Sequence, residues 1–265
     1  MKRKKPTKNN YFSPEMDRYY FSASQVKSFM SCEARTLAQI RGEWNPPPGV
    51  ALLTGSFVDA AFEGPKSLER FKAGHPELYN KRDGTLKADY RRAADMVVRA
   101  RQDPLFMEFM RGQKQKILTG QIDGIPFKCK LDVFRKGERI VDLKTTKDMQ
   151  PIYKPGEGRL SFADYWLWPL QMAIYQYIEG NKLPCYLAVI TKEDPPDIAV
   201  IQVEQEKMDA EMDFLRTKLP RYDAIKRGLI EPERCENCAY CRATKKLSGV
   251  RLLEEFNDFG GTTLE

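Results

Sequence analysis

Two aspartates and a lysine form the spacing in this chain that most suggests chemistry. Asp132 lies in KCKLDVF, and Asp142 lies in IVDLKTT with Lys144 two positions later. The apolar residues around Asp142 predict a strand, and side chains two positions apart on a strand point to the same face. This strand therefore presents a carboxylate and an amine side by side.

The two aspartates predict a metal site. A short turn joins their strands, and neighbouring strands lie about 5 Å apart, so both carboxylates can converge on one Mg²⁺, which prefers carboxylate and water oxygens. The metal would lower the pKa of a bound water. Lys144 would then contact that water or a scissile phosphate. The alternative is a surface ion pair between Asp142 and Lys144, worth about 0–1 kcal/mol, which leaves the apolar neighbours unexplained.

A second candidate site consists of cysteines. The stretch CENCAYC carries C-x2-C-x2-C, at Cys235, Cys238 and Cys241. Three thiolates leave a four-coordinate site one ligand short, and Cys32 is the natural fourth although it lies far upstream. Four thiolates suit either a [4Fe–4S] cluster or zinc.

The segments around these residues predict an α/β (α+β mixed) fold, with a central mixed sheet of about five strands flanked by helices. Asp123-Gly124 is a strong signal for a hairpin between the first two strands. The predicted strands are 115–122, 125–135, 139–145, 185–191 and 197–203. The predicted helices are 22–42, 52–63, 87–111 with a second helix after Pro104, 165–180 and 205–227, and residues 148–163 are predicted to form a loop.

The composition favours a globular protein with a polyanionic partner. The chain has 265 residues and a net charge of +7, which favours nucleic acid although the charge is spread along the sequence. No apolar run reaches the roughly 18 residues of a membrane span. The basic N-terminus has no apolar stretch behind it and is not a signal peptide. We expect a cytoplasmic protein with free thiols.

Other residues are predicted to have no catalytic role. Cys129 and Cys185 lie in predicted strands and read as buried small hydrophobic side chains. The single histidine, His75, lies in a loop-like stretch, which disfavours a histidine-based nucleophilic scheme. We expect residues 1–20 to be a disordered basic arm, 21–245 a single domain and 246–265 a polar tail.

The motif order resembles the PD-(D/E)XK nuclease superfamily. D-x9-D-x-K after a hairpin, followed by a helix carrying Q-x3-Y, is similar to the RecB-like and lambda-type exonuclease branch. IVDLKTT also resembles the corresponding strand of phage RecE-type exonucleases, and the resemblance spans roughly residues 22–245. It implies that the helix residues face the active site and contact DNA, whereas packing alone would place Tyr175 in the core. The implied catalytic residues are Asp132, Asp142, Lys144, Gln171 and Tyr175.

The resemblance also points to further metal ligands. Relatives in this branch often carry a histidine on an earlier helix, and the matching position in GSFVDAAFEG is Asp59. Asp59 is an oxygen ligand, although it could instead lie on the helix surface, and Glu63 is a weaker candidate. Many relatives carry a glutamate before the first motif aspartate. Gln115 occupies that place here, so the sequence leaves open whether the site holds one metal ion or two.

The one-plus-three cysteine layout resembles the iron–sulfur nucleases of the AddB-type and CRISPR-associated groups, although their spacing is often longer. It favours a structural [4Fe–4S] cluster over zinc, with Cys32 joining the chain ends.

The resulting expectation is a Mg²⁺- or Mn²⁺-dependent DNA exonuclease of phage or prophage recombination or DNA-end processing, in the cytoplasm of a bacterial host. It would act on duplex ends or single strands, without a membrane, and the resemblance implies a phage single-strand annealing protein as partner. The alternatives are a non-catalytic nucleic-acid-binding module on a nuclease scaffold and a DNA endonuclease.

Overall fold

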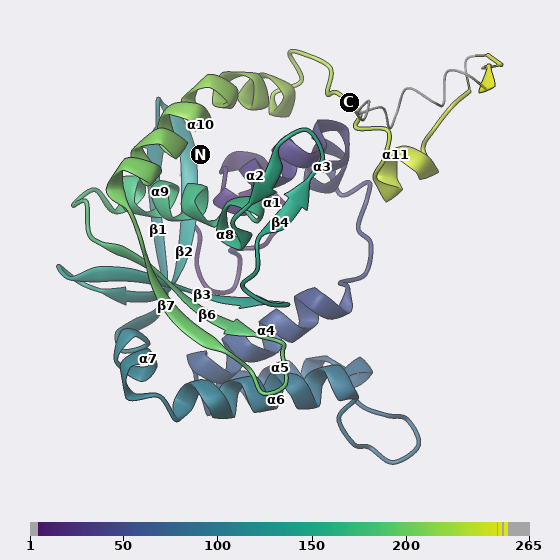
Figure 1. Ribbon diagram of the computed structural model, residues 1–265. Coiled ribbons are helices and arrows are strands. Elements are labelled where there is room, and N and C mark those ends of the chain that lie inside the picture. Colours follow the sequence, from purple (N-terminus) through teal and green to yellow (C-terminus); the bar gives the residue numbers. More distant parts are fainter. Residues whose placement is uncertain (1–4, 248, 251, 254–265) are drawn as a thin grey trace, which may run out of the picture.

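A five-stranded mixed sheet forms the centre of the molecule (Figure 1). The computed structural model describes residues 5–247, 249–250 and 252–253. The sheet order is β1-β2-β3-β6-β7, with only the β3–β6 pair parallel. The predicted fold class is therefore confirmed. The strands are β1 (Gln113–Ile122), β2 (Ile125–Arg135), β3 (Arg139–Thr146), β6 (Cys185–Thr191) and β7 (Ile198–Val203).

Both predicted hairpins form. Asp123 and Gly124 have φ values of 49° and 80°, as a tight two-residue turn between twisted strands requires. The β1–β2 ladder continues from Ile122 opposite Ile125 to Gln113 opposite Phe134. The β2–β3 ladder is much shorter and covers only three residue pairs at the turn end.

Helices cover both faces of the sheet (Figure 1). Apolar side chains of alternating strand positions divide between two cores, because successive side chains point to opposite faces. One core packs against α2 (Ala23–Ser31), α3 (Glu33–Arg41), α9 (Trp168–Glu179) and α10 (Gln205–Lys226). The other packs against α4 (Val50–Glu63), α6 (Ala88–Arg101) and α7 (Pro104–Phe109), with α5 (Pro65–Gly74) and the 3-10 helix η1 (Pro76–Leu78) beside it.

Several predicted boundaries were wrong. The predicted helix 22–42 is two helices, because Cys32 has extended backbone and its sulfur caps α3 by accepting the Arg35 N–H. The helix predicted at 165–180 begins only at Trp168, as α9, because Leu167 has a φ of 53°, and the separate short helix α8 (Phe162–Tyr165) precedes it. The predicted loop 148–163 contains a small hairpin, β4 (Ile152–Lys154) and β5 (Gly158–Leu160). The short helix α11 (Ala239–Ala243) lies within the cysteine stretch.

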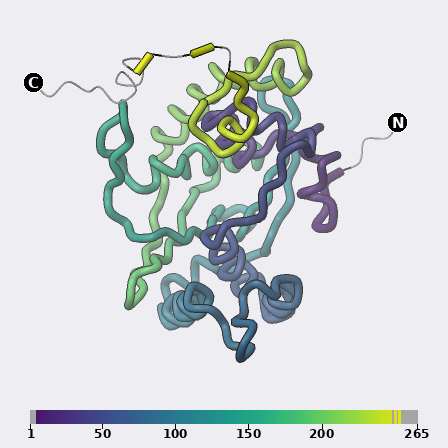
Figure 2. Tube along the Cα trace, turned by 90° about the vertical axis from the view of Figure 1, so that its right-hand side faces the viewer, coloured from purple at the N-terminus to yellow at the C-terminus, as the bar shows by residue number. Residues whose placement is uncertain are grey.

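The N-terminal segment is the main correction. Residues 5–20 pack on the domain, with α1 (Pro14–Tyr19) capped by Ser13 and with Met16 buried, so the predicted disordered arm is wrong for these residues. Residues 1–4 and most of the predicted tail lie outside the described part of the chain. Figure 2 shows the yellow C-terminal segment lying against the purple N-terminal helices, where the Ala34 N–H donates to the Glu233 carbonyl at 3.0 Å. Among the residues that the structure describes, no helix has both the length and the apolar character that a membrane span needs.

Candidate active site and cysteine cluster

The predicted aspartates meet where β2 and β3 separate. Pairing between these strands stops at Val133 opposite Val141. Beyond that point an Asp132 side-chain oxygen accepts the Leu143 backbone N–H at 3.0 Å. Asp142 is 1% exposed and forms an ion pair with Lys144. The strands thus open at the position where both carboxylates can face a common space.

Asp59 joins these two aspartates from α4. Asp59 and Asp132 line a small cavity of about 10 Å³, a volume that holds roughly one water molecule. Burial, and then the Asp142 carboxylate, raises the pKa of Asp59 to about 7, against the lowering effect of Lys144. Burial and the other two carboxylates also hold the pKa of Asp132 well above its usual range.

This arrangement fits a divalent cation. Asp59 and Asp132 line one cavity, and burial together with the nearby Asp142 carboxylate raises the pKa of both. Asp142 Oδ2 has no partner besides the Lys144 ammonium within the described residues. Carboxylate oxygens are the donors that Mg²⁺ prefers, with waters completing its shell. A cation among them would favour the ionised carboxylates, against the burial and mutual repulsion that raise the pKa values of Asp59 and Asp132.

Gln171 connects the acidic residues to the helical layer. Its Nε2 donates to Asp142 Oδ1 and to the Tyr175 hydroxyl, both at 3.0 Å. Its Oε1 accepts from Lys27 at 2.8 Å and from Lys144 at 3.4 Å. The structure therefore brings both helix residues of the motif to the site, with Tyr175 packed in the core and its hydroxyl turned toward Gln171.

Lys27 is the site residue that the sequence analysis missed. Burial, and then the nearby Lys144 ammonium, lowers the pKa of Lys27 to about 7, although Asp142 opposes this. The available signal was the polar face of an otherwise apolar helix, where Ser24, Lys27 and Ser28 recur at helical spacing.

The weaker candidates lie at the edge of the site. Gln115, with φ of 53°, donates from Nε2 to Asp132 Oδ1 at 3.1 Å, so it occupies the expected place without adding charge. Glu63 accepts from Ser67 at 2.7 Å and pairs with Lys8 at 3.4 Å. His75 is paired with a neighbouring glutamate in the turn after α5.

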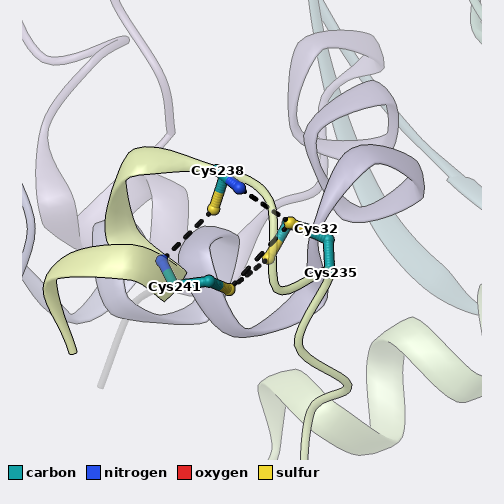
Figure 3. Close-up of side chains that lie close together, drawn as sticks. All are labelled: Cys32, Cys235, Cys238 and Cys241. Atoms are coloured by element: carbon teal, nitrogen blue, oxygen red, sulfur yellow. Dashed lines mark hydrogen bonds between the residues drawn. The ribbon is translucent and has the colours of Figure 1, made fainter. Parts of the chain in front are cut away.

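The structure brings the four predicted cysteines together (Figure 3). Their sulfur atoms all lie within 4.8 Å of one another. Cys32 Sγ lies 3.6 Å and Cys235 Sγ 3.9 Å from Cys241 Sγ. Burial opposes ionisation of Cys235, but backbone N–H groups lower its pKa to about 6. Cys129 and Cys185 are fully buried elsewhere, as predicted.

An ion-pair clamp supports the cysteine cluster. The Arg221 guanidinium donates two hydrogen bonds to the Glu33 carboxylate, at 2.7 and 2.8 Å. The same carboxylate accepts the Glu233 backbone N–H at 2.7 Å. The clamp holds the chain just before Cys235 against the residue that follows Cys32. Soft thiolates gathered in this way fit zinc or an iron–sulfur cluster.

Comparisons with known proteins agree with this geometry. A crystal structure from Eubacterium rectale, described as that of a "putative exonuclease", is 34% identical and superimposes with a TM-score of 0.91, covering 96% of this chain and 98% of that chain. A second solved structure, SSO0001, is 11% identical over 82% of this chain and 95% of that chain, and its TM-score is 0.29. No curated protein matched the chain.

A family model covers most of the sequence. The family is described as a PDDEXK-like domain of unknown function (DUF3799), and its model matches residues 22–244. The predicted PD-(D/E)XK superfamily is thereby confirmed, whereas the RecB/RecE-like branch and the iron–sulfur motif stay predictions. With the motif residues of β2, β3 and α9 gathered where β2 and β3 separate, the chain belongs to the PDDEXK-like family DUF3799.

Proposed function

We propose that this protein is a Mg²⁺- or Mn²⁺-dependent DNA exonuclease that hydrolyses phosphodiester bonds. The observation that carries the proposal is the cavity lined by Asp59 and Asp132 close to the Asp142–Lys144 ion pair. The PDDEXK-like family and the name of the Eubacterium rectale protein support it.

Each residue has a distinct role in this proposal. Asp59, Asp132 and Asp142 would hold the metal ion, which when bound lowers the pKa of a water and stabilises negative charge on phosphorus. Lys144 donates to the attacking water or the scissile phosphate. Gln171 orients Asp142 and Lys144 through the contacts described above, and Tyr175 supports Gln171.

The cysteine cluster would hold a structural metal centre. The resemblance to iron–sulfur nucleases favours [4Fe–4S]. Zinc is the second candidate, because four thiolates about 2.3 Å from one tetrahedral ion lie about 3.8 Å apart, close to the observed 3.6 and 3.9 Å. An absorption band near 400 nm in protein purified without oxygen, with iron on metal analysis, supports the cluster. A colourless protein with one zinc ion per chain would instead assign zinc to the four cysteines.

The biological setting follows from the same resemblance. We propose a role in phage or prophage recombination or DNA-end processing in a bacterial cytoplasm, where an exonuclease would supply single-stranded DNA to an annealing protein. Co-purification of an annealing protein with this chain tests the partnership. We expect the annealing protein to be lost when an unrelated nuclease replaces this chain.

The test of activity is cleavage of end-labelled linear duplex DNA with and without Mg²⁺. We expect wild-type protein to release label, Lys144→Ala to lose this activity, and Lys147→Ala to keep it. Lys147 is the matched control because its side chain is 94% exposed and, among the described residues, its ammonium pairs with Asp148 alone. Cleavage of closed circular DNA, which has no ends, would show that the protein is an endonuclease and not an exonuclease. Folded protein that binds DNA but cleaves no linear, circular or single-stranded substrate would indicate a binding module.

A further inference from the structure

A groove of about 520 Å³ lies between the N-terminal segment and the linker from α3 to α4. Ligand sites commonly have volumes of about 300–1,000 Å³. The groove lining includes Phe12 from the N-terminal segment, Trp44 from the linker, and Ser24 and Ser28 from α2. The mechanism proposed above uses none of these side chains.

The groove borders the acidic site. Lys27 lies on α2 between the two groove serines and donates to Gln171 at 2.8 Å. Tyr11 also lines the groove, and burial together with the nearby Cys129, Asp17 and Asp132 raises its pKa. The Tyr11 end of the groove therefore lies on the side of the acidic site, close enough to Asp132 for its charge to act on Tyr11.

The lining has two exposed or half-buried aromatic rings, and a lysine outside the lining lies beside one of them. Phe12 is 71% exposed, and the Lys130 ammonium lies 4.7 Å from its ring centroid. Trp44 is half-buried at the other segment of the lining. Rings and cations along a groove are typical of single-strand binding, since unpaired bases stack on rings while cations follow the phosphates. Paired bases in a duplex do not offer their faces in this way.

We propose that this groove holds a single strand of DNA at the acidic site, with bases stacked on Phe12 and Trp44. The proposal rests on the proposed nuclease function and specifies its substrate as a strand separated from its complement. The Ser24 and Ser28 hydroxyls in the lining and the Lys130 ammonium beside Phe12 would donate to phosphates of the same strand.

The cysteine cluster positions one of the two stacking residues. The Trp44 ring packs edge-on against Tyr240, with centroids 5.5 Å apart. Tyr240 lies between Cys238 and Cys241 in the sequence. A metal centre at the cysteines therefore supports the groove, and its loss should weaken strand binding.

The test is binding of a short fluorescein-labelled oligodeoxythymidylate, followed by fluorescence anisotropy in EDTA so that no cleavage occurs. Removing a stacking ring costs roughly 1–3 kcal/mol per base, so we expect Phe12→Ala and Trp44→Ala each to weaken binding by at least about five-fold. Phe214→Ala is the matched control, because Phe214 is 44% exposed and has Lys218 at 5.6 Å but lies outside the groove. Phe12→Tyr and Trp44→Phe keep an aromatic ring at each position and should retain most of the wild-type affinity.

The outcomes separate the groove from the nuclease. Unchanged affinity in both alanine variants, or equal losses in Phe214→Ala, overturns the groove proposal even if the protein cleaves DNA. The groove proposal is also overturned if the protein binds duplex DNA more tightly than single-stranded DNA and if Phe12→Ala and Trp44→Ala weaken both equally. If wild-type protein binds the strand through these rings but cleaves nothing with Mg²⁺, the groove stands and the proposed nuclease function fails. Circular dichroism spectra and melting curves establish that each variant is folded.

Discussion

The Asp132 carboxylate accepts the backbone N–H of Leu143 at 3.0 Å. This contact replaces the ladder hydrogen bond that continued pairing of β2 and β3 would give to Leu143, since pairing ends at Val133 opposite Val141. A motif aspartate thus holds the neighbouring strand while the strands separate around the acidic site. The other carboxylate oxygen of Asp132 is held by Gln115 at 3.1 Å.

Asp132→Asn should raise stability and abolish activity. The amide can still accept the Leu143 N–H, but it removes one of three mutually repelling carboxylates, which burial and its neighbours hold at a raised pKa. A gain of about 1 kcal/mol would raise Tm by roughly 2–4 °C for a domain of about this size. Melting curves in EDTA and the cleavage assay measure both effects. A lower Tm in EDTA would contradict the charge-repulsion argument.

The apparent Mg²⁺ affinity should rise between pH 5 and pH 8. The folded pKa of Asp59 is raised to about 7 from 3.8, so below pH 7 a proton competes with the metal for this carboxylate. The same shift means that the metal-free protein loses stability between about pH 4 and pH 7, because the unfolded chain gives up this proton first. Calorimetric Mg²⁺ titration at several pH values tests this, and Asp59→Asn should flatten the dependence. An affinity that does not change with pH in the wild type would exclude Asp59 as a ligand.

Gln171→Ala should lower kcat far more than Tyr175→Phe. Gln171 contacts Asp142, Lys144 and Lys27, so its loss leaves three charged groups without their shared partner. Misplaced catalytic groups can cost about 10²-fold. Tyr175→Phe removes only the acceptor at 3.0 Å from Gln171 Nε2, for which we expect a loss below about ten-fold, since one hydrogen bond contributes about 0.5–1.5 kcal/mol. Equal losses in single-turnover cleavage would assign Tyr175 a more direct role.

Cys32→Ser should remove bound metal, whereas Cys129→Ala should retain it. Cys32 is one of four thiolates within 4.8 Å, while Cys129 is buried in the sheet core. Metal analysis of both purified variants gives the comparison. A Cys32→Ser protein that retains the full metal content would show that three cysteines suffice.

Loss of the metal centre should change substrate binding more than chemistry. The cysteine cluster contacts the groove through Tyr240 and Trp44, while none of its four thiolates contacts a motif residue in the described structure. We expect Cys241→Ser to raise KM for single-stranded DNA by about five-fold or more, as loss of one stacking ring would, with kcat within about two-fold of wild type. Steady-state cleavage at varied substrate concentration separates the two parameters, and a fall in kcat alone would argue against this coupling.

The sequence by itself determined the five strands of the central sheet, the two hairpins that join its first three strands, and the motif residues. Local signals suffice for these features: Asp123-Gly124 sets a tight turn, alternation predicts β2 and β3, and helical spacing puts Gln171 and Tyr175 on one face. These signals depend on backbone geometry and side-chain periodicity within a few residues.

Tertiary structure alone decided how distant side chains meet. Nothing near Lys27 in the sequence shows that its ammonium reaches Gln171, and the basic composition of the N-terminal segment concealed that Met16 becomes buried. The separation of β2 from β3 likewise depends on the Asp132 contact with Leu143. Burial, charge coupling and the choice between strand pairing and side-chain capping arise only when the chain is packed, because each depends on neighbours supplied by other elements.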